Sequence, residues 1–327
     1  MNRKNLIIAV AIFAGGVLAG WLAAIFVADH LKPASGVEIH EGQYLYVNPL
    51  LECEDGGLIS ARELTSFRSS VEDLIEEQKD RGTVRSVAVY FRDLNNGPWF
   101  GIGERGPFSA ASLLKVPILM AYLKHAEDDP SILGKKILAS GDTDGMQNIR
   151  PSEVVKAGNV YTVEDLLYKM IVYSENNAAR LLLAEDGSNY CQKIYADLGL
   201  PVPDVTKPDY SITVKAYASF FRVLFNASYL NRQWSNQALD LLSKAEFGGG
   251  LRAGVPSRVT VTHKFGERKI DDEIQFHDCG IVYYPDRPYL LCVMTRGENL
   301  ADLVSAVQDI SHLAFSEVDN QMRGGGR

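Results

Sequence analysis

The order of hydrophobic and polar positions divides the chain into an apolar N-terminal segment, a polar connector and a longer folded region. Residues 5–28 carry no charged side chain over 24 positions, and the basic residues Arg3 and Lys4 precede them. A helix of that length rises about 36 Å, which exceeds the roughly 30 Å hydrocarbon core of a bilayer. We therefore expect residues 5–28 to form an uncleaved transmembrane anchor. A cleaved signal peptide is the alternative, although its apolar region is usually shorter, about 7–15 residues.

The positive flank predicts the orientation of this anchor. Basic residues stay on the cytoplasmic side, so residues 1–4 are expected in the cytoplasm and the chain after residue 28 outside it. Residues 29–60 contain scattered proline and glycine without a sustained period, and we expect a tether there. Residues 61–318 are expected to form the folded domain, and residues 319–327 a disordered tail. The sequence thus predicts a single-pass cell-membrane protein with an extracytoplasmic domain.

Helical and strand periodicities alternate through the folded region. The expected helices cover residues 61–81, 112–127, 162–172, 176–185, 214–225 and 300–315. The expected strands cover residues 84–91, 99–103, 258–265, 275–284 and 289–295. Short turns between several of these strands imply antiparallel pairing. We therefore predict an α/β fold that consists of an antiparallel five-stranded sheet flanked by helices and, in addition, a mostly helical lobe. A cleft is expected between sheet and lobe.

Composition narrows the possible functions. The net charge is −8 and there is no basic run, which argues against a nucleic-acid partner. The histidines and cysteines lack metal-site spacing, so neither a metal nor another cofactor is expected. Four cysteines allow three complete pairings. Cys279 and Cys292 flank a predicted turn and could face each other across a hairpin, whereas buried free thiols are the other interpretation.

The strongest chemical signal is the pair Ser112 and Lys115 at the start of a predicted helix. Residues three apart in a helix share one face, so the hydroxyl and the amine lie one turn apart. A serine becomes a nucleophile when a base takes its proton, and a lysine can be that base where burial destabilises its ammonium. Apolar residues follow both, and the positive end of the helix dipole acts on this turn. The setting therefore favours a Ser–Lys catalytic pair.

Three further segments follow in an order that resembles a known group of enzymes. They are Tyr173-Ser174-Glu175-Asn176, then Leu251-Arg252-Ala253-Gly254-Val255-Pro256 ahead of Thr262-His263-Lys264-Phe265-Gly266-Glu267, and finally Thr295-Arg296-Gly297. With the Ser112 segment, they resemble the serine β-lactamase and penicillin-binding-protein superfamily, and the class A β-lactamases most closely. The resemblance covers residues 61–315. It implies the β-lactamase/transpeptidase-like fold and catalysis through a serine acyl-enzyme.

The resemblance implies a role for each matching residue. Ser112 would attack an amide carbonyl and Lys115 would accept its proton, while Ser174, helped by the charge of Lys264, would pass a proton to the leaving nitrogen. The backbone N–H groups of Ser112 and Glu267 would form the oxyanion hole. The expected catalytic residues are Ser112, Lys115, Ser174 and Lys264, and the expected substrate-binding residues are Asn176, Phe265, Gly266 and Glu267. His263 is expected to point to the other face of its strand as a structural residue.

The sequence departs from the family pattern at three places. Glu175 stands where an aspartate is usual, which retains an acid. Phe265 stands where the family has a hydroxyl residue that binds the substrate carboxylate, which puts ordinary penicillin recognition in doubt. The glutamate that activates the deacylating water is not found, because the only glutamate between residues 177 and 214 is Glu185, inside a predicted helix. Asp204 or Asp209 could substitute for it.

Three functions remain open at this point. The first is a membrane-anchored hydrolase of the class A β-lactamase type, acting on a β-lactam. The second is a peptidoglycan D,D-peptidase or penicillin-binding enzyme that deacylates slowly, with a peptidoglycan stem peptide as substrate. The third is a non-catalytic cell-envelope binding domain, against which the retention of all the catalytic residues argues.

Overall fold

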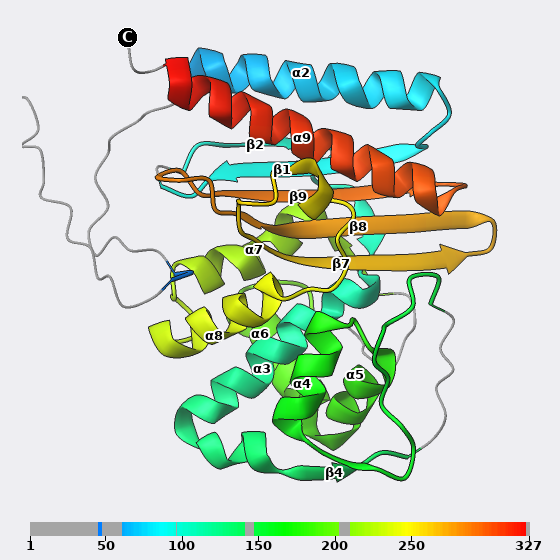
Figure 1. Ribbon diagram of the computed structural model, residues 1–327, viewed down its shortest axis with the longest axis vertical. Coiled ribbons are helices and arrows are strands. Elements are labelled where there is room, and N and C mark those ends of the chain that lie inside the picture. The colour runs from blue at the N-terminus through cyan, green and yellow to red at the C-terminus, as the bar shows by residue number, and fades with distance from the viewer. Residues whose placement is uncertain (1–44, 48–60, 96, 141–146, 203–209, 325–327) are drawn as a thin grey trace, which may run out of the picture. The chain divides into compact units, whose positions relative to one another are not determined.

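The computed structural model describes residues 45–47, 61–95, 97–140, 147–202 and 210–324 (Figure 1). The predicted anchor at residues 5–28, most of the tether, and both Asp204 and Asp209 lie outside these residues. Within the described ranges, no helix has the length and apolar character that a membrane crossing requires.

A five-stranded antiparallel sheet forms the centre of the domain, with strand order β2-β1-β9-β8-β7. The strands are β1 (Ser86–Asp93), β2 (Trp99–Ile102), β7 (Val261–Ile270), β8 (Glu273–Val282) and β9 (Tyr289–Gly297). The predicted five-stranded antiparallel sheet is therefore confirmed. Strands β7 and β8 extend beyond the expected ranges 258–265 and 275–284, because their pairing continues to Ile270 and Glu273, and Asp271 in a left-handed conformation (φ 53°) makes the turn.

Two helices cover one face of this sheet. They are α2 (Ala61–Asp80) and α9 (Leu300–Gly324), which run side by side above the strands in Figure 1. Apolar residues of both, such as Val71 and Val307, are buried against the sheet together with Phe276. The prediction of a disordered tail from residue 319 is wrong for residues 319–324, since α9 continues to Gly324. Val318 is buried, and Asp319 accepts a hydrogen bond from Tyr284 Oη, so packing holds this last stretch.

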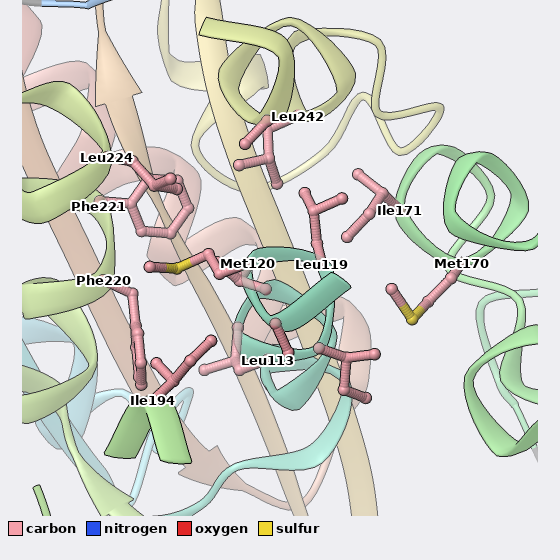
Figure 2. Close-up of a cluster of buried hydrophobic side chains, with 14 of the residues drawn as sticks. Leu113, Leu119, Met120, Met170, Ile171, Ile194, Phe220, Phe221, Leu224 and Leu242 are labelled. Atoms are coloured by element: carbon pink, nitrogen blue, oxygen red, sulfur yellow. The ribbon is translucent and has the colours of Figure 1, made fainter. Parts of the chain in front are cut away.

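The helical lobe covers the opposite face and surrounds α3 (Lys115–Asp128). Around it lie α4 (Val163–Val172), α5 (Asn176–Leu182), α6 (Ser188–Asp197), α7 (Val214–Phe225) and α8 (Arg232–Ser243). Figure 2 shows Leu119 and Met120 of α3 among side chains from α4, α7 and α8, including Ile171 and Phe221. Every residue of α3 from Lys115 to Leu123 is buried, which explains the continuous apolar run in its sequence.

The lobe contains elements that the sequence did not predict. The helix expected over residues 176–185 is α5, which ends at Leu182 and passes into a π-helical turn, Leu183–Gly187, before α6. Two short strand pairs also form, β3 (Pro107–Ser109) with β6 (Ser211–Thr213), and β4 (Lys136–Leu138) with β5 (Val160–Thr162). Each of these strands has three residues, too few to show a period of two.

A disulfide joins Cys279 of β8 to Cys292 of β9, which are direct partners in the register of the two strands. Of the two interpretations for this pair, the bridge across the hairpin is thus the one that the structure has. Cys191, in α6, is a buried free thiol. Cys53 lies outside the described residues.

Candidate active site

Ser112 lies in a short 3-10 turn, Ala111–Leu114, directly ahead of α3. Ala111 has a left-handed backbone (φ 46°), an unusual conformation for a residue with a side chain, and strain of this kind often occurs at functional sites. Leu113 of the same turn is fully buried, and its carbonyl accepts a hydrogen bond from Tyr217 Oη at 3.0 Å. The turn is therefore anchored on the lobe side while Ser112 stays half-exposed.

Lys115 is the first residue of α3, and its side chain is buried with an exposed fraction of 3%. Its Nζ lies 3.0 Å from Ser112 Oγ, 3.1 Å from Ser174 Oγ and 2.8 Å from Asn176 Oδ1, and it also donates to the Ser174 carbonyl. Four oxygens thus surround one amine that has at most three N–H donors. A neutral amine can donate to the two carbonyl-type oxygens and accept the proton of Ser112 with its lone pair.

The electrostatic surroundings favour this neutral form. Burial is the largest cause that lowers the pKa of Lys115 well below its ordinary value, and the positive charge of Lys264 lowers it further. Glu175 and Glu267 act in the opposite direction and do not offset these two causes. Lys115 therefore has the geometry and the pKa direction that a general base for Ser112 requires.

Ser174 and Asn176 are positioned by the junction between α4 and α5. Ser174 has a left-handed backbone (φ 55°) and is buried, with an exposed fraction of 1%. Glu175 is the N-cap of α5, because its carboxylate accepts a hydrogen bond from the Ala178 amide. Glu175 thus fixes the turn that directs its two neighbours toward Lys115, which explains why an acid is retained at this position.

Lys264 reaches Ser174 from the sheet. It lies on β7, the edge strand of the sheet, which contacts the Ser112 turn (Figure 1). Its Nζ donates to Ser174 Oγ at 2.8 Å and to the Phe265 carbonyl at 2.9 Å, and the side chain is almost completely buried. Burial lowers the pKa of Lys264 to about 7, against an attraction to Asp278 that raises it. Ser112, Lys115, Ser174 and Lys264 therefore form one continuous hydrogen-bonded chain.

Gly266 brings β7 against the backbone of the Ser112 turn. A Cβ added to Gly266 would lie 3.1 Å from the amide nitrogens of both Ser112 and Leu113, so a larger residue would push the strand and the turn apart. The strand thus passes directly beside the Ser112 N–H group, as an oxyanion hole built from Ser112 and Glu267 requires. The role of the Glu267 N–H group stays a prediction.

The side chains on either side of Gly266 are not free to meet a substrate. The Phe265 ring is buried, with an exposed fraction of 4%, and packs against Phe247 with ring centroids 4.4 Å apart. The Glu267 carboxylate accepts hydrogen bonds from Asn148 Nδ2 at 2.7 Å and from the Ile149 amide at 2.6 Å. Phe265 therefore fills space next to Lys264, and Glu267 ties β7 to the segment that begins at residue 147.

Two residues near the site escaped the sequence analysis. Gln147 donates to the Ser174 carbonyl at 3.0 Å, and nothing in its sequence surroundings indicated this. Asp278 is fully buried on β8, where it pairs with His263 Nδ1 at 2.9 Å and accepts from the Leu251 amide at 2.9 Å. An aspartate within an apolar strand is the signal that could have revealed Asp278. His263 is buried and held by this contact, which fits the structural role expected for it.

No described residue near this network replaces the glutamate that activates the deacylating water in the family pattern. Glu185 lies in the π-helical turn, and its Oε1 is 3.4 Å from Lys135 Nζ, so its carboxylate pairs with a lysine outside the network. Asp204 and Asp209 lie outside the described residues. Among the residues that are described, no group of three or more histidine, cysteine or acidic side chains is arranged to hold a metal ion.

Comparison with known proteins gives the family. The model of the family described as "Beta-lactamase enzyme family" matches residues 66–318. No curated protein sequence matches the chain. The chain belongs to this β-lactamase family, and it is a β-lactamase-like serine hydrolase that acts on amide bonds.

Solved structures share the fold at low sequence identity. A mutant of PBP-A, in an acyl-enzyme complex with penicillin G, is 21% identical with a TM-score of 0.66, over 79% of this chain and 97% of that one. A class A β-lactamase from Mycobacterium abscessus is 21% identical with a TM-score of 0.65, over 76% of this chain and 99% of that one. A β-lactamase from Sphaerobacter thermophilus is 20% identical with a TM-score of 0.64, over 77% and 97%. These likenesses confirm the predicted fold class.

Proposed function

We propose that the protein is a membrane-anchored, extracytoplasmic serine hydrolase of the class A β-lactamase type, which opens a β-lactam or a related amide through an acyl-enzyme on Ser112. The observation that supports this most is the position of Lys115 Nζ, within 3.1 Å of both Ser112 Oγ and Ser174 Oγ. One amine can thus take a proton from the nucleophile and return it through the second serine.

The acylation step balances with the residues at the site. Neutral Lys115 takes the proton of Ser112 as Oγ bonds to the carbonyl carbon, and the carbonyl oxygen gains negative charge beside the Ser112 N–H. The C–N bond then breaks. Ser174 gives its proton to the leaving nitrogen and regains one from Lys115, while Lys264 stabilises the Ser174 oxygen. For a lactam, the opened ring stays attached to Ser112.

Intact-protein mass spectrometry of the full chain in detergent, mixed with a penicillin or a cephalosporin, tests this proposal. Drug consumption that depends on Ser112 supports a working hydrolase, and the Ser112→Ala variant is the control that should neither consume drug nor gain mass. If the unaltered protein neither gains an adduct nor consumes drug, the β-lactam proposal is wrong, and peptidoglycan stem peptides are the substrates to test next.

A D,D-peptidase or penicillin-binding enzyme with slow deacylation is the second candidate. The ion pair of Glu185 with Lys135 favours it, because the only glutamate between residues 177 and 214 is engaged elsewhere. A β-lactam adduct that persists on Ser112 for hours would select this candidate. Rapid loss of the adduct with release of opened drug would select the hydrolase.

The membrane location is a separate part of the proposal. Residues 5–28 carry no charge and are long enough to cross a bilayer. We expect the full chain to remain in the membrane pellet after alkaline extraction, and the folded domain to be digested by protease added to intact spheroplasts. Release of the full-length chain into the alkaline supernatant would contradict the anchor.

A further inference from the structure

The ammonium group of Lys264 has no open side from which a ligand could approach. It donates to Ser174 Oγ at 2.8 Å and to the Phe265 carbonyl at 2.9 Å, and it lies 4.1 Å from the centroid of the Phe265 ring. Its side chain has an exposed fraction of 1%. Two protons therefore meet oxygens, and the aromatic ring covers the charge in the manner of a cation–π contact.

The ring that covers Lys264 is itself held in place. Phe247 packs against Phe265 with centroids 4.4 Å apart, and the buried Phe276 contacts both rings, at 5.8 Å from Phe247 and 6.4 Å from Phe265. Gly249 permits this arrangement, because a Cβ at that position would lie 2.6 Å from the Phe247 ring. We call Phe247 and Phe265 the aromatic pair. Since the aromatic pair is fixed by packing, it does not simply move aside for an anion.

The aromatic pair lies at the leaving-group end of the site. Ser112 Oγ contacts Lys115 Nζ, which contacts Ser174 Oγ, which in turn contacts Lys264 Nζ. A leaving nitrogen that takes its proton from Ser174 must lie next to Ser174 Oγ. The substituent on that nitrogen therefore lies on the side of Ser174 where Lys264 is buried under the Phe265 ring.

A carboxylate in this position would lose its water without gaining an ion pair. Lys264 has an exposed fraction of 1% and two of its N–H groups are already bonded, so it is out of reach of a carboxylate, and a pKa of about 7 leaves it only partly charged at neutral pH. An anion that loses water without gaining donors is strongly disfavoured, whereas a neutral group does not bear this cost.

We propose that the subsite beside Ser174 takes a leaving group without a carboxylate, with a neutral substituent on the side of Lys264, because the aromatic pair withholds that ammonium from an anion. This inference rests on the proposed acylation of Ser112, and it defines the substrate class as esters, amides or lactams that are uncharged next to the leaving atom.

The test compares benzylpenicillin with its methyl ester, two compounds that differ in this one charge. The rate of the Ser112 adduct is measured by intact-protein mass spectrometry on the full chain in detergent. We expect the ester to acylate at least about tenfold faster than the acid, because the acid buries an unpaired charge. An equal or faster rate for the acid overturns the inference and leaves acylation itself standing. Adduct from neither compound overturns both.

Two variants separate the aromatic pair from general effects of the detergent and of folding. Phe265→Thr uncovers Lys264 and supplies a hydroxyl, and Phe247→Ala loosens the cover while it keeps Phe265. We expect both to lower the ester-to-acid ratio, Phe265→Thr by about tenfold or more. Partition of the ester into micelles cancels when ratios are compared between variants. If Phe265→Thr does not fold, the ratio in Phe247→Ala decides, and an unchanged ratio there overturns the inference.

Discussion

Gly266 offers a direct test of how closely β7 must approach the nucleophile. In the Gly266→Ala variant, the new methyl carbon would lie 3.1 Å from two amide nitrogens, those of Ser112 and Leu113, and 3.3 Å from Leu113 Cγ. Non-bonded carbon contacts are optimal at about 3.5–4.0 Å. The strand and the Ser112 turn must therefore separate by a few tenths of an ångström, and neither can yield through a side-chain rotation, because two of the three contacts are with backbone atoms.

That separation should reduce acylation more than it reduces stability. A displacement of about 1 Å at a reacting centre can cost on the order of 100-fold in rate, so roughly three- to tenfold is expected for this smaller shift. Complete loss of one oxyanion donor lowers the rate by roughly 100- to 1,000-fold, and this sets the upper limit for the effect of Gly266→Ala on acylation. Overpacking typically costs about 1–3 kcal/mol in the free energy of unfolding.

The assay is the rate of β-lactam adduct formation on the full chain, with urea unfolding followed in parallel. Gly248→Ala is the matched control, since nothing lies within 4 Å of a Cβ at that position and its backbone is not left-handed. Wild-type acylation in Gly266→Ala would refute the argument that contact of β7 with the Ser112 turn forms the oxyanion site. An equal loss of rate in Gly248→Ala would refute it as well.

Three further predictions concern the same region. Lys264→Met removes a charge that lowers the pKa of Lys115, so the pH at which acylation becomes half-maximal should rise. Lys269 is exposed, and Lys269→Met should leave that pH unchanged. The measurement is the pH profile of adduct formation. Glu267→Gln places an amide N–H₂ against one of the two N–H donors that Glu267 binds, at a cost of about 1–3 kcal/mol, and so loosens the tie between β7 and residues 148–149. A looser segment beside the site should admit bulky β-lactams more readily, so their acylation rates should rise relative to those of small ones. Identical relative rates would contradict the tie. Replacing Cys279 and Cys292 together by alanine removes a bridge over a separation of 13 residues, which should lower the unfolding free energy by roughly 3 kcal/mol in urea titration; an unchanged urea midpoint would show that the bridge does not constrain the unfolded chain.

Local signals in the sequence were sufficient for the longer elements. The helix expected at residues 214–225 is α7 with the same bounds, because a strong helical period follows the cap at Thr213, whose Oγ1 accepts from the Ala216 amide. Thr162 and Asp165 form a capping box at the start of α4, the helix expected over residues 162–172. These signals depend on residues three or four apart, and such spacing can be read without knowledge of the tertiary structure.

Other features depend on contacts that have no local signature. The left-handed backbone at Ala111 places Ser112 in a 3-10 turn rather than in the expected regular helix, and no glycine marked the position. Residues 319–324 read as a frayed tail, yet they stay helical where Arg287 reaches Gln321 at 2.8 Å. The covering of Lys264 by Phe265 depends on contact of Phe265 with Phe247, which lies 18 positions earlier in a different segment. The sequence thus identified which residues take part, and tertiary packing determined what they can contact.

The two lysines of the site show why the chemistry and the choice of substrate can change independently. Lys115 is buried among oxygens, and the proton that it exchanges comes from Ser112 and returns through Ser174, whatever acyl group is present. Lys264 is buried against a ring, and its surroundings decide what can lie next to the leaving atom. Phe265 alters only this second environment, since its carbonyl still holds Lys264 against Ser174. An exchange of a hydroxyl for a ring at position 265 can therefore redirect the site to another substrate class without removing a single hydrogen bond of the acylation network.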